Sequence, residues 1–439
     1  MRSAILAIIF ILIIAYPFSV SLKVLDDVWY KHPYIDEMFW IPASNIAFQD
    51  FFITHDFSKE TWDQAYYSWG NYNPTIGKFI MGLFIYLWGD SQWRTFPVKE
   101  GTEELTAKVS FPTVETFLAA RAPNFILACL SCSLLFFVVY VCIGFKEGVL
   151  AAILFAYNPI VRFVSHLAVT DFYVMFFGLL STFFLILLIK GISRKSVPFI
   201  LGICTPAVGL CAGFCIGSKL SGFLNLINIV LLLSIAWLFT LCAPWLTGKF
   251  KSIHIARIKK NTRWILPSIT ILTMVISLSV FVFSNPFLYR DTSNNIHHMY
   301  SHKASLEERY DSVSLSFKEK ITVALGKHLL GDYHALHTKK FHRLSVVANF
   351  IFVVMGFCYF CIFIMKDINS GNYTRANTKI ILLSWCIIYL GGTLWWVSRD
   401  WYRWLMPAMP PLIILESIAI IYICQFGYNL LCKKYWSLS

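Results

Sequence analysis

An acidic pair and a basic turn motif lie near the start of the chain, just after its first hydrophobic segment. Asp36 and Glu37 are adjacent, and Asn73-Pro74-Thr75-Ile76-Gly77-Lys78 follows. A carboxylate can accept a proton from an attacking hydroxyl, and a lysine can stabilise a phosphate anion. A passive membrane anchor needs neither group. The pairing therefore favours an enzyme that works at the membrane surface.

Hydrophobic segments account for most of the remaining sequence. Of its 439 residues, 57% are hydrophobic and 14% are charged. A spanning helix needs about 20 mostly apolar residues. The candidate segments are 3–20, 117–143, 148–164, 172–189, 197–216, 221–243, 264–285, 345–365, 380–397 and 405–426. Segment 3–20 lacks a clean small-residue cleavage site, so we expect a retained first helix. The sequence predicts an all-α polytopic membrane protein with about ten transmembrane helices.

The distribution of basic residues predicts the orientation. If the helices alternate, one side of the membrane receives a large group of Lys and Arg residues: Arg2, Lys146, Lys190, Arg194, Lys195, Lys249, Lys251, Arg257, Lys259, Lys260, Arg263, Lys366, Arg375, Lys379, Lys433 and Lys434. By the positive-inside rule this side is cytoplasmic, and both termini lie there. The net charge of +13 mostly reflects this bias. Nucleic-acid binding is not expected, because no folded basic domain is visible.

Two long segments fall on the outer side, and the whole chain, 1–439, is predicted to form one membrane domain. The first outer loop is 21–116 and the second is 286–344. Within the first, 75–88 is apolar but too short to span, which predicts an interfacial helix. The second loop is predicted to be partly helical, with a helix start at Ser305. Neither loop contains cysteine, so no disulfide framework is expected.

Most predicted spans carry no charge, and the exceptions lie at outward ends or turns. These residues are Arg121, Arg162, His166, Asp171, Lys219, Arg399, Asp400 and Arg403. All of them face the side of Asp36 and Glu37, so they could converge on one outward cavity. Charges near a membrane are costly and indicate function, although a single Arg or Lys could equally snorkel to headgroups. Glu416 is the one acid deep in a helix, and no role is assigned to it.

The order of the motifs resembles that of a known family. The segments concerned are 34–37, 73–78, 120–124, 162–171, 284–289 and 399–407. They resemble the Asp-Glu, His-Pro-Pro-Leu-Gly-Lys and later motifs of the protein O-mannosyltransferases, which are polyprenyl-phosphate-sugar-dependent enzymes of the GT-C class. Asn73 replaces the family's His, and Thr75 replaces its second Pro. No insertion is large enough for the extra lumenal domain of eukaryotic members. The chain is therefore more similar to the smaller prokaryotic relatives, which include the aminoarabinose transferases of lipid A.

The resemblance implies a GT-C-like fold and an inverting glycosyltransferase at the outer face of a prokaryotic cytoplasmic membrane. The donor would be a polyprenyl-phosphate-linked mannose or related hexose or pentose. The acceptor hydroxyl would belong to a protein, a lipid or an envelope glycan. By resemblance Asp36 is the catalytic base, with Glu37 beside it. Cations would stabilise the leaving phosphate: Lys78, Arg121 and Arg403, with Arg399 and Lys219 as further candidates.

The link before the fourth predicted helix has two interpretations. Asp171 could hold the acceptor or orient Arg121 or Lys78, with Arg162 and His166 nearby. It could equally cap the helix that follows, because Asp is a favoured N-cap residue.

A divalent metal is a further possibility, although the resemblance requires no cofactor. The second outer loop is rich in histidine, and His298 and His302 are spaced to share one helix face. Together with Glu37 they could bind zinc. A histidine-rich surface loop could equally be only polar.

Two other classes of function compete with an enzyme. A transporter or lipid-linked-sugar flippase places ionisable groups near the membrane midplane, often in two related halves. Here the helix interiors are nearly free of charge, no internal symmetry is visible, and Glu416 is the only midplane candidate. A non-catalytic assembly subunit would have little need for Asp36 with Lys78.

Overall fold

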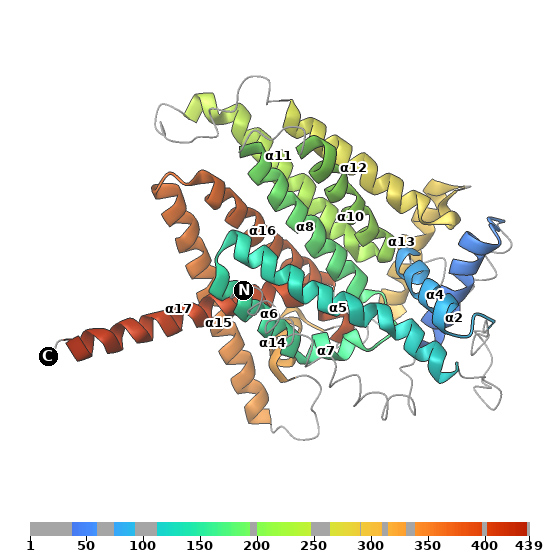
Figure 1. Ribbon diagram of the computed structural model, residues 1–439, viewed down its shortest axis with the longest axis horizontal. Helices are drawn as coiled ribbons and strands as arrows, with labels where there is room; N and C mark the ends of the chain where they lie inside the picture. Colours follow the sequence, from blue (N-terminus) through green and yellow to red (C-terminus); the bar gives the residue numbers. More distant parts are fainter. Residues whose placement is uncertain are drawn as a thin grey trace, which may run out of the picture.

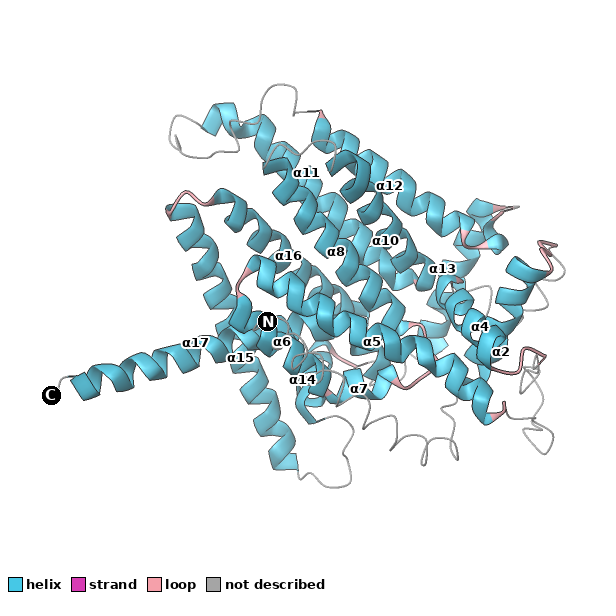
Figure 2. Cartoon of the chain, in the orientation of Figure 1, coloured by secondary structure: helices cyan, strands magenta, loops and turns pink. Residues whose placement is uncertain are grey.

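The computed structural model describes residues 37–58, 74–92, 112–193, 200–246, 264–289, 291–309, 315–330, 339–396 and 402–436. Within these segments every regular element is a helix, and turns connect them (Figure 2). The helices pack into a bundle in which segments distant in sequence lie side by side (Figure 1). The predicted all-α polytopic class is confirmed.

Six helices of the described segments are long and apolar enough to cross a membrane. They are α5 (Val114–Cys142), α8 (Asp171–Ser193), α12 (Ile265–Phe283), α15 (Lys339–Asn369), α16 (Tyr373–Trp396) and α17 (Met409–Trp436). The pair α6 (Phe145–Tyr157) and α7 (Pro159–Ser165) passes the same test as a single span with a 59° bend. The described part of the chain therefore holds six or seven candidate spans, fewer than the ten or so predicted.

Three of the predicted segments, 3–20, 197–216 and 221–243, are not among these spans. Segment 3–20 lies outside the described residues. Residues 197–199 also lie outside them, and the described residues from 200 onward form the π-helical turn η2 (Ile200–Cys204) and the short helix α10 (Thr205–Ser218), which ends where the backbone becomes extended at Lys219. The 3-10 turn η3 (Leu220–Gly222) then leads into α11 (Phe223–Leu246). The break at Lys219 lies between the predicted segments 197–216 and 221–243, where the sequence predicted a turn.

The bend between α6 and α7 follows from Asn158-Pro159. The Asn158 side chain accepts hydrogen bonds of 3.0 Å from the backbone N–H groups of Ile160 and Val161, which caps α7. Pro159 occupies the first turn of α7, where a missing N–H costs nothing. The cap turns the chain, so that α7 carries Arg162 toward the start of α8.

A row of glycines allows α10 to approach its neighbours. A Cβ atom at Gly209 would lie 2.8 Å from Ile276 Cβ, and one at Gly213 would lie 2.6 Å from Val280 Cβ, so α12 packs directly on the α10 backbone. A Cβ at Gly217 would lie 2.7 Å from Ile76 Cγ1. Small residues at this spacing are typical of close helix contacts in membranes. The row therefore positions the start of the short helix that begins at Ile76.

The first outer loop contributes two helices that pack against each other. They are α2 (Glu37–Phe48), which continues into the π-helical turn η1 (Gln49–Ile53), and α4 (Ile76–Trp88). Gly82 of α4 lies against the backbone of Ser44, where a side chain would clash. The predicted short helix within 75–88 is thus present. Its first half is buried against α2, α5 and α10, and its last turn is exposed.

The second outer loop is partly helical, as predicted. It begins with η6 (Pro286–Leu288) and contains α13 (Thr292–Arg309) and α14 (Phe317–Leu330). The predicted helix start at Ser305 is wrong, because Ser305 lies inside α13. The helix begins after Asp291, whose carboxylate accepts a hydrogen bond of 3.3 Å from the Asn294 N–H. An acidic cap at that position satisfies an N–H group that the helix leaves unpaired.

Candidate functional site

The centre of the site is a buried ion pair between α2 and α5. Arg121 donates from Nε to Glu37 Oε1 and from Nη2 to Glu37 Oε2, both at 2.7 Å. The backbone N–H of Ala168 donates to Glu37 Oε1 at 2.9 Å. Glu37 is fully buried and Arg121 is 8% exposed. The carboxylate therefore joins α2, α5 and the link before α8.

Asn124 of α5 also forms hydrogen bonds with the link before α8. It lies one turn after Arg121 on α5, and its amide donates to the carbonyl oxygens of Leu167 and, at 2.7 Å, Val169. The segment 120–124 thus supplies both the partner of Glu37 and the support for the link. Sequence reasoning missed this role. A buried polar side chain one turn from an arginine, in an otherwise apolar helix, was the available signal.

Lys78 lies in the first turn of α4 and is fully buried. Its Nζ atom lies 5.8 Å from the ring centroid of Trp40, which is one turn after Glu37 on α2. Burial lowers the pKa of the Lys78 ammonium from its ordinary value. A nearby anion favours the charged form of such a group. Asp36, which precedes Glu37 in the chain, lies outside the described residues.

Two sequence motifs meet at the start of α4. The Thr75 N–H donates to Asn285 Oδ1 at 3.1 Å, and the Thr75 hydroxyl donates to the carbonyl of Ser284. Both Thr75 and Asn285 are buried. The basic turn motif is thereby fixed to the beginning of the second outer loop, 210 residues further along the chain.

Asp171 pairs with Lys219 at 2.6 Å, and both lie at the end of the bundle that carries Lys78. Asp171 is the first residue of α8 and Lys219 separates α10 from η3. Asp171 thus contacts neither Arg121 nor Lys78, the two partners that we considered for it. An acid in the first turn of a helix also suits the helix dipole.

The remaining predicted residues are placed as follows. His166 is buried at the end of α7, where Nδ1 contacts Ser165 Oγ at 3.1 Å and the Arg162 carbonyl; Arg162 is half-buried. Arg403 belongs to the 3-10 helix η8 (Tyr402–Ala408), which packs against α7, α8 and α16. Arg399 lies outside the described residues. The backbone thus brings Arg403 to the helices that carry Arg162 and Asp171.

The predicted metal site does not form from Glu37 and His298. Glu37 is buried and bonded to Arg121, whereas His298 is exposed on α13. His302 lies on the same helix. Across the described ranges, no three His, Cys, Asp or Glu side chains are close enough to share a metal ion.

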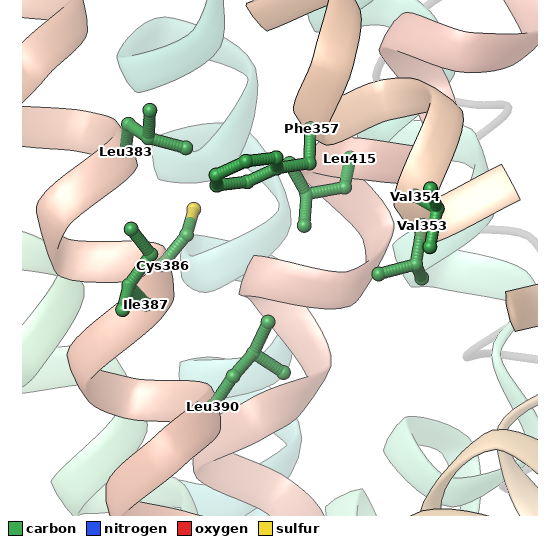
Figure 3. A pocket seen from close by; sticks show the side chains of 8 residues that line it. All are labelled: Val353, Val354, Phe357, Leu383, Cys386, Ile387, Leu390 and Leu415. Carbon is green, nitrogen blue, oxygen red and sulfur yellow. The ribbon is translucent and has the colours of Figure 1, made fainter. Parts of the chain in front are cut away.

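A pocket of about 200 Å³ lies away from these charges, between α15, α16 and α17 (Figure 3). Its lining residues are Val353, Val354, Phe357, Leu383, Cys386, Ile387, Leu390 and Leu415. None of the predicted site residues is among them. The pocket can therefore offer apolar contacts and no acid–base chemistry.

No protein-family model matches the chain, and no curated protein matches it. Several solved structures have a similar fold. The oligosaccharyltransferase of Archaeoglobus fulgidus in the apo form has a TM-score of 0.53 and 13% identity, over 97% of this chain and 52% of that one. The archaeal oligosaccharyltransferase AglB from Archaeoglobus fulgidus, in complex with an inhibitory peptide and a dolichol-phosphate, has a TM-score of 0.52 and 12% identity, over 90% and 47%. ArnT from Cupriavidus metallidurans, bound to undecaprenyl phosphate, has a TM-score of 0.51 and 12% identity, over 94% and 59%.

The fold is therefore that of the GT-C glycosyltransferases, and the fold that the motif order implied is confirmed. The chain spans about half the length of the archaeal enzymes that it matches.

Proposed function

We propose that the protein is an inverting glycosyltransferase that transfers a sugar from a polyprenyl phosphate to an acceptor hydroxyl. The reaction would take place at the outer face of a prokaryotic cytoplasmic membrane. The main support is the buried Glu37–Arg121 pair, because it brings Glu37, the Arg motif of α5 and the link before α8 to one place. Buried charges of this kind are costly and cluster at functional sites.

The fold neighbours support the class of donor. One was solved with dolichol-phosphate and another with undecaprenyl phosphate, and both ligands are polyprenyl phosphates. A chain with the same fold, a buried lysine on α4 and a buried arginine on α5 is suited to a similar anionic headgroup.

In the proposed reaction, the acceptor oxygen attacks the anomeric carbon while the bond from that carbon to the phosphate oxygen breaks. Asp36 takes the proton of the acceptor hydroxyl. The departing polyprenyl phosphate gains negative charge, which Lys78, Arg121 and Arg403 stabilise. Glu37 engages the Nε and Nη2 atoms of Arg121, so Nη1 is the group that we assign to the phosphate. Lys219, the further candidate from the sequence, is paired with Asp171.

The experiment uses purified protein in nanodiscs, incubated with a panel of polyprenyl-phosphate sugars. Release of polyprenyl phosphate is followed by mass spectrometry for the wild type and Asp36→Asn. We expect turnover with at least one donor and its loss in the variant. Consumption of donor by both proteins at the same rate would remove Asp36 from the mechanism. If neither protein consumes any donor, a transporter or flippase becomes the better explanation, and Glu416, buried in α17, is the residue to test in transport assays.

A further inference from the structure

Three buried side chains near the start of α4 carry polar atoms without a hydrogen-bond partner. They are Trp40 Nε1, Thr170 Oγ1 and Tyr173 OH, and none of them has a partner in the described structure. Trp40 is 5% exposed, Thr170 1% and Tyr173 0%. They come from α2, from the link before α8 and from α8, three elements that the Glu37 contacts and α4 bring together.

Contacts with Gly77 and Lys78 place these three residues around one turn of helix. A Cβ atom at Gly77 would lie 2.6 Å from Thr170 Cγ2 and 3.5 Å from Tyr173 Cδ2. The Lys78 Nζ atom lies 5.8 Å from the Trp40 ring centroid. The three residues therefore surround the segment that carries the proposed phosphate-binding lysine.

Packing does not require the polar atoms of these residues. Valine has the shape of threonine and phenylalanine nearly that of tyrosine, and either replacement would avoid the cost of an unsatisfied buried hydroxyl. Polar groups that are kept without partners near a binding residue are suited to a ligand that supplies those partners. Threonine and tyrosine hydroxyls donate and accept, whereas the tryptophan N–H only donates. This set matches the hydroxyl groups of a sugar.

The charges around the cluster indicate the kind of sugar. Of the carboxylates in the described structure that flank the cluster, Glu37 is bonded to Arg121 and Asp171 to Lys219. A sugar with an ammonium group would meet Lys78 and two carboxylates that already have basic partners. A neutral, hydroxylated sugar attached to an anionic phosphate fits both the unpartnered polar atoms of the cluster and the positive charge of Lys78.

We infer that Trp40, Thr170 and Tyr173 form a subsite for a neutral, hydroxylated donor sugar, next to the phosphate that Lys78 binds. The inference rests on the proposed function and extends it, because it names the residues that select the sugar. It also disfavours aminoarabinose as the transferred group.

The test compares binding of three ligands in nanodiscs: undecaprenyl phosphate, undecaprenyl-phosphate mannose and undecaprenyl-phosphate aminoarabinose. We expect the wild type to bind the mannose derivative most tightly. Tyr173→Phe and Thr170→Val should each weaken its binding by about three- to ten-fold, the loss of one hydrogen bond. Their affinity for undecaprenyl phosphate should stay within about two-fold of the wild type, because the phosphate contacts remain.

Tyr389→Phe is the matched control. Tyr389 is a buried tyrosine on α16 whose hydroxyl lies against Cys215 and Gly178 rather than near Gly77. This variant should bind all three ligands as the wild type does. The melting temperature of the ligand-free Tyr173→Phe and Thr170→Val proteins should be unchanged or higher, since each loses an unsatisfied group.

Several results would overturn the subsite. A lower melting temperature of the two variants would assign their hydroxyls to folding. An equal loss of affinity for undecaprenyl phosphate would assign them to the phosphate, and tighter binding of the aminoarabinose derivative would reverse the selectivity. Wild-type protein that neither binds nor consumes any donor would overturn the proposed function together with the subsite. If the wild type consumes donor and the variants bind the mannose derivative normally, only the subsite fails.

Discussion

The carboxylate of Glu37 and the guanidinium of Arg121 are joined by two hydrogen bonds of 2.7 Å in the buried junction of α2 and α5. This bidentate geometry fixes the plane of the guanidinium as well as its position. The Ala168 N–H adds a third bond to the carboxylate, so the pair also determines where the link before α8 lies. Glu37 is thus best described as a positioning residue for Arg121.

Removal of one partner of this pair should destabilise the protein strongly. Glu37→Met leaves a buried guanidinium without its carboxylate, which costs about 3–5 kcal/mol. The double variant Glu37→Met with Arg121→Met should recover much of this stability, because replacing both charges by apolar groups is often neutral. Thermal unfolding in detergent measures both effects.

The donor-turnover assay separates the structural role of the pair from its catalytic role. The double variant should remain inactive even where its stability is restored, since Arg121 is lost from the phosphate. Activity in the stable double variant would contradict a role for Arg121 in the reaction.

Lys78 should take up a proton when the donor phosphate binds. Burial lowers the pKa of its ammonium group in the ligand-free protein, so the group is partly neutral at a pH between this lowered value and the ordinary one of 10.5. A bound phosphate favours the charged form and raises the pKa again. Calorimetry at mildly alkaline pH, in buffers of different ionisation enthalpy, should detect proton uptake with undecaprenyl phosphate in the wild type and not in Lys78→Met.

The same lowered pKa predicts how stability depends on pH. Between the lowered pKa and 10.5, the unfolded chain binds more protons at Lys78 than the folded one. This residue therefore makes the free energy of unfolding of the ligand-free protein rise with pH over that range. Lys78→Met should remove this increase. Lys146→Met is the control, because Lys146 is exposed on α6.

In the calorimetric experiment, a proton uptake in Lys78→Met equal to that of the wild type would assign the uptake to another group.

The contact between Thr75 and Asn285 should control the position of α4. Thr75→Val removes the hydroxyl that bonds the Ser284 carbonyl and keeps the shape of the side chain. The loss of a buried hydrogen bond should cost about 1–3 kcal/mol. It should also lower kcat more than it raises KM, because Lys78 follows three residues later on the same turn. Thr322→Val is a matched change, since the Thr322 hydroxyl bonds only the Lys318 carbonyl one turn earlier in α14. Equal effects of the two variants on kcat would show that the contact does not position Lys78.

The helical class could be predicted because its cause is local. A segment that spans a membrane must satisfy its own backbone hydrogen bonds and present apolar side chains, and both requirements are visible in the sequence. How closely the helices approach one another depends on contacts between distant segments. The glycines at 209, 213 and 217 let α12 and α4 approach α10, and hydropathy does not reveal these contacts.

The site was predicted as a group of residues and not as a set of contacts. The sequence indicated that Glu37, Arg121, Asp171 and Lys219 would share the outward end of the bundle. It could not indicate that these four would form two ion pairs, because Glu37 and Arg121 are 84 residues apart and Asp171 and Lys219 are 48 apart. Charge types alone do not determine which acids neutralise which bases. The roles of Asp36 and Arg399, which lie outside the described residues, stay predictions.

Asn124 should be as important for the site as the charged residues, although it makes no proposed contact with a substrate. Asn124→Leu removes the amide that donates to the carbonyl oxygens of Leu167 and Val169, and only the Leu167 carbonyl keeps a second donor among the hydrogen bonds of the described residues, the Val169 N–H. We expect a loss of about 2–4 kcal/mol in stability, and reduced turnover because the Ala168 N–H between these carbonyls no longer holds Glu37. Ser133→Ala on the same helix is the control, since that hydroxyl bonds only the Cys129 carbonyl one turn earlier. It should change stability by no more than about 0.5 kcal/mol. An Asn124→Leu protein as stable and active as the control would mean that the link keeps its shape without this amide.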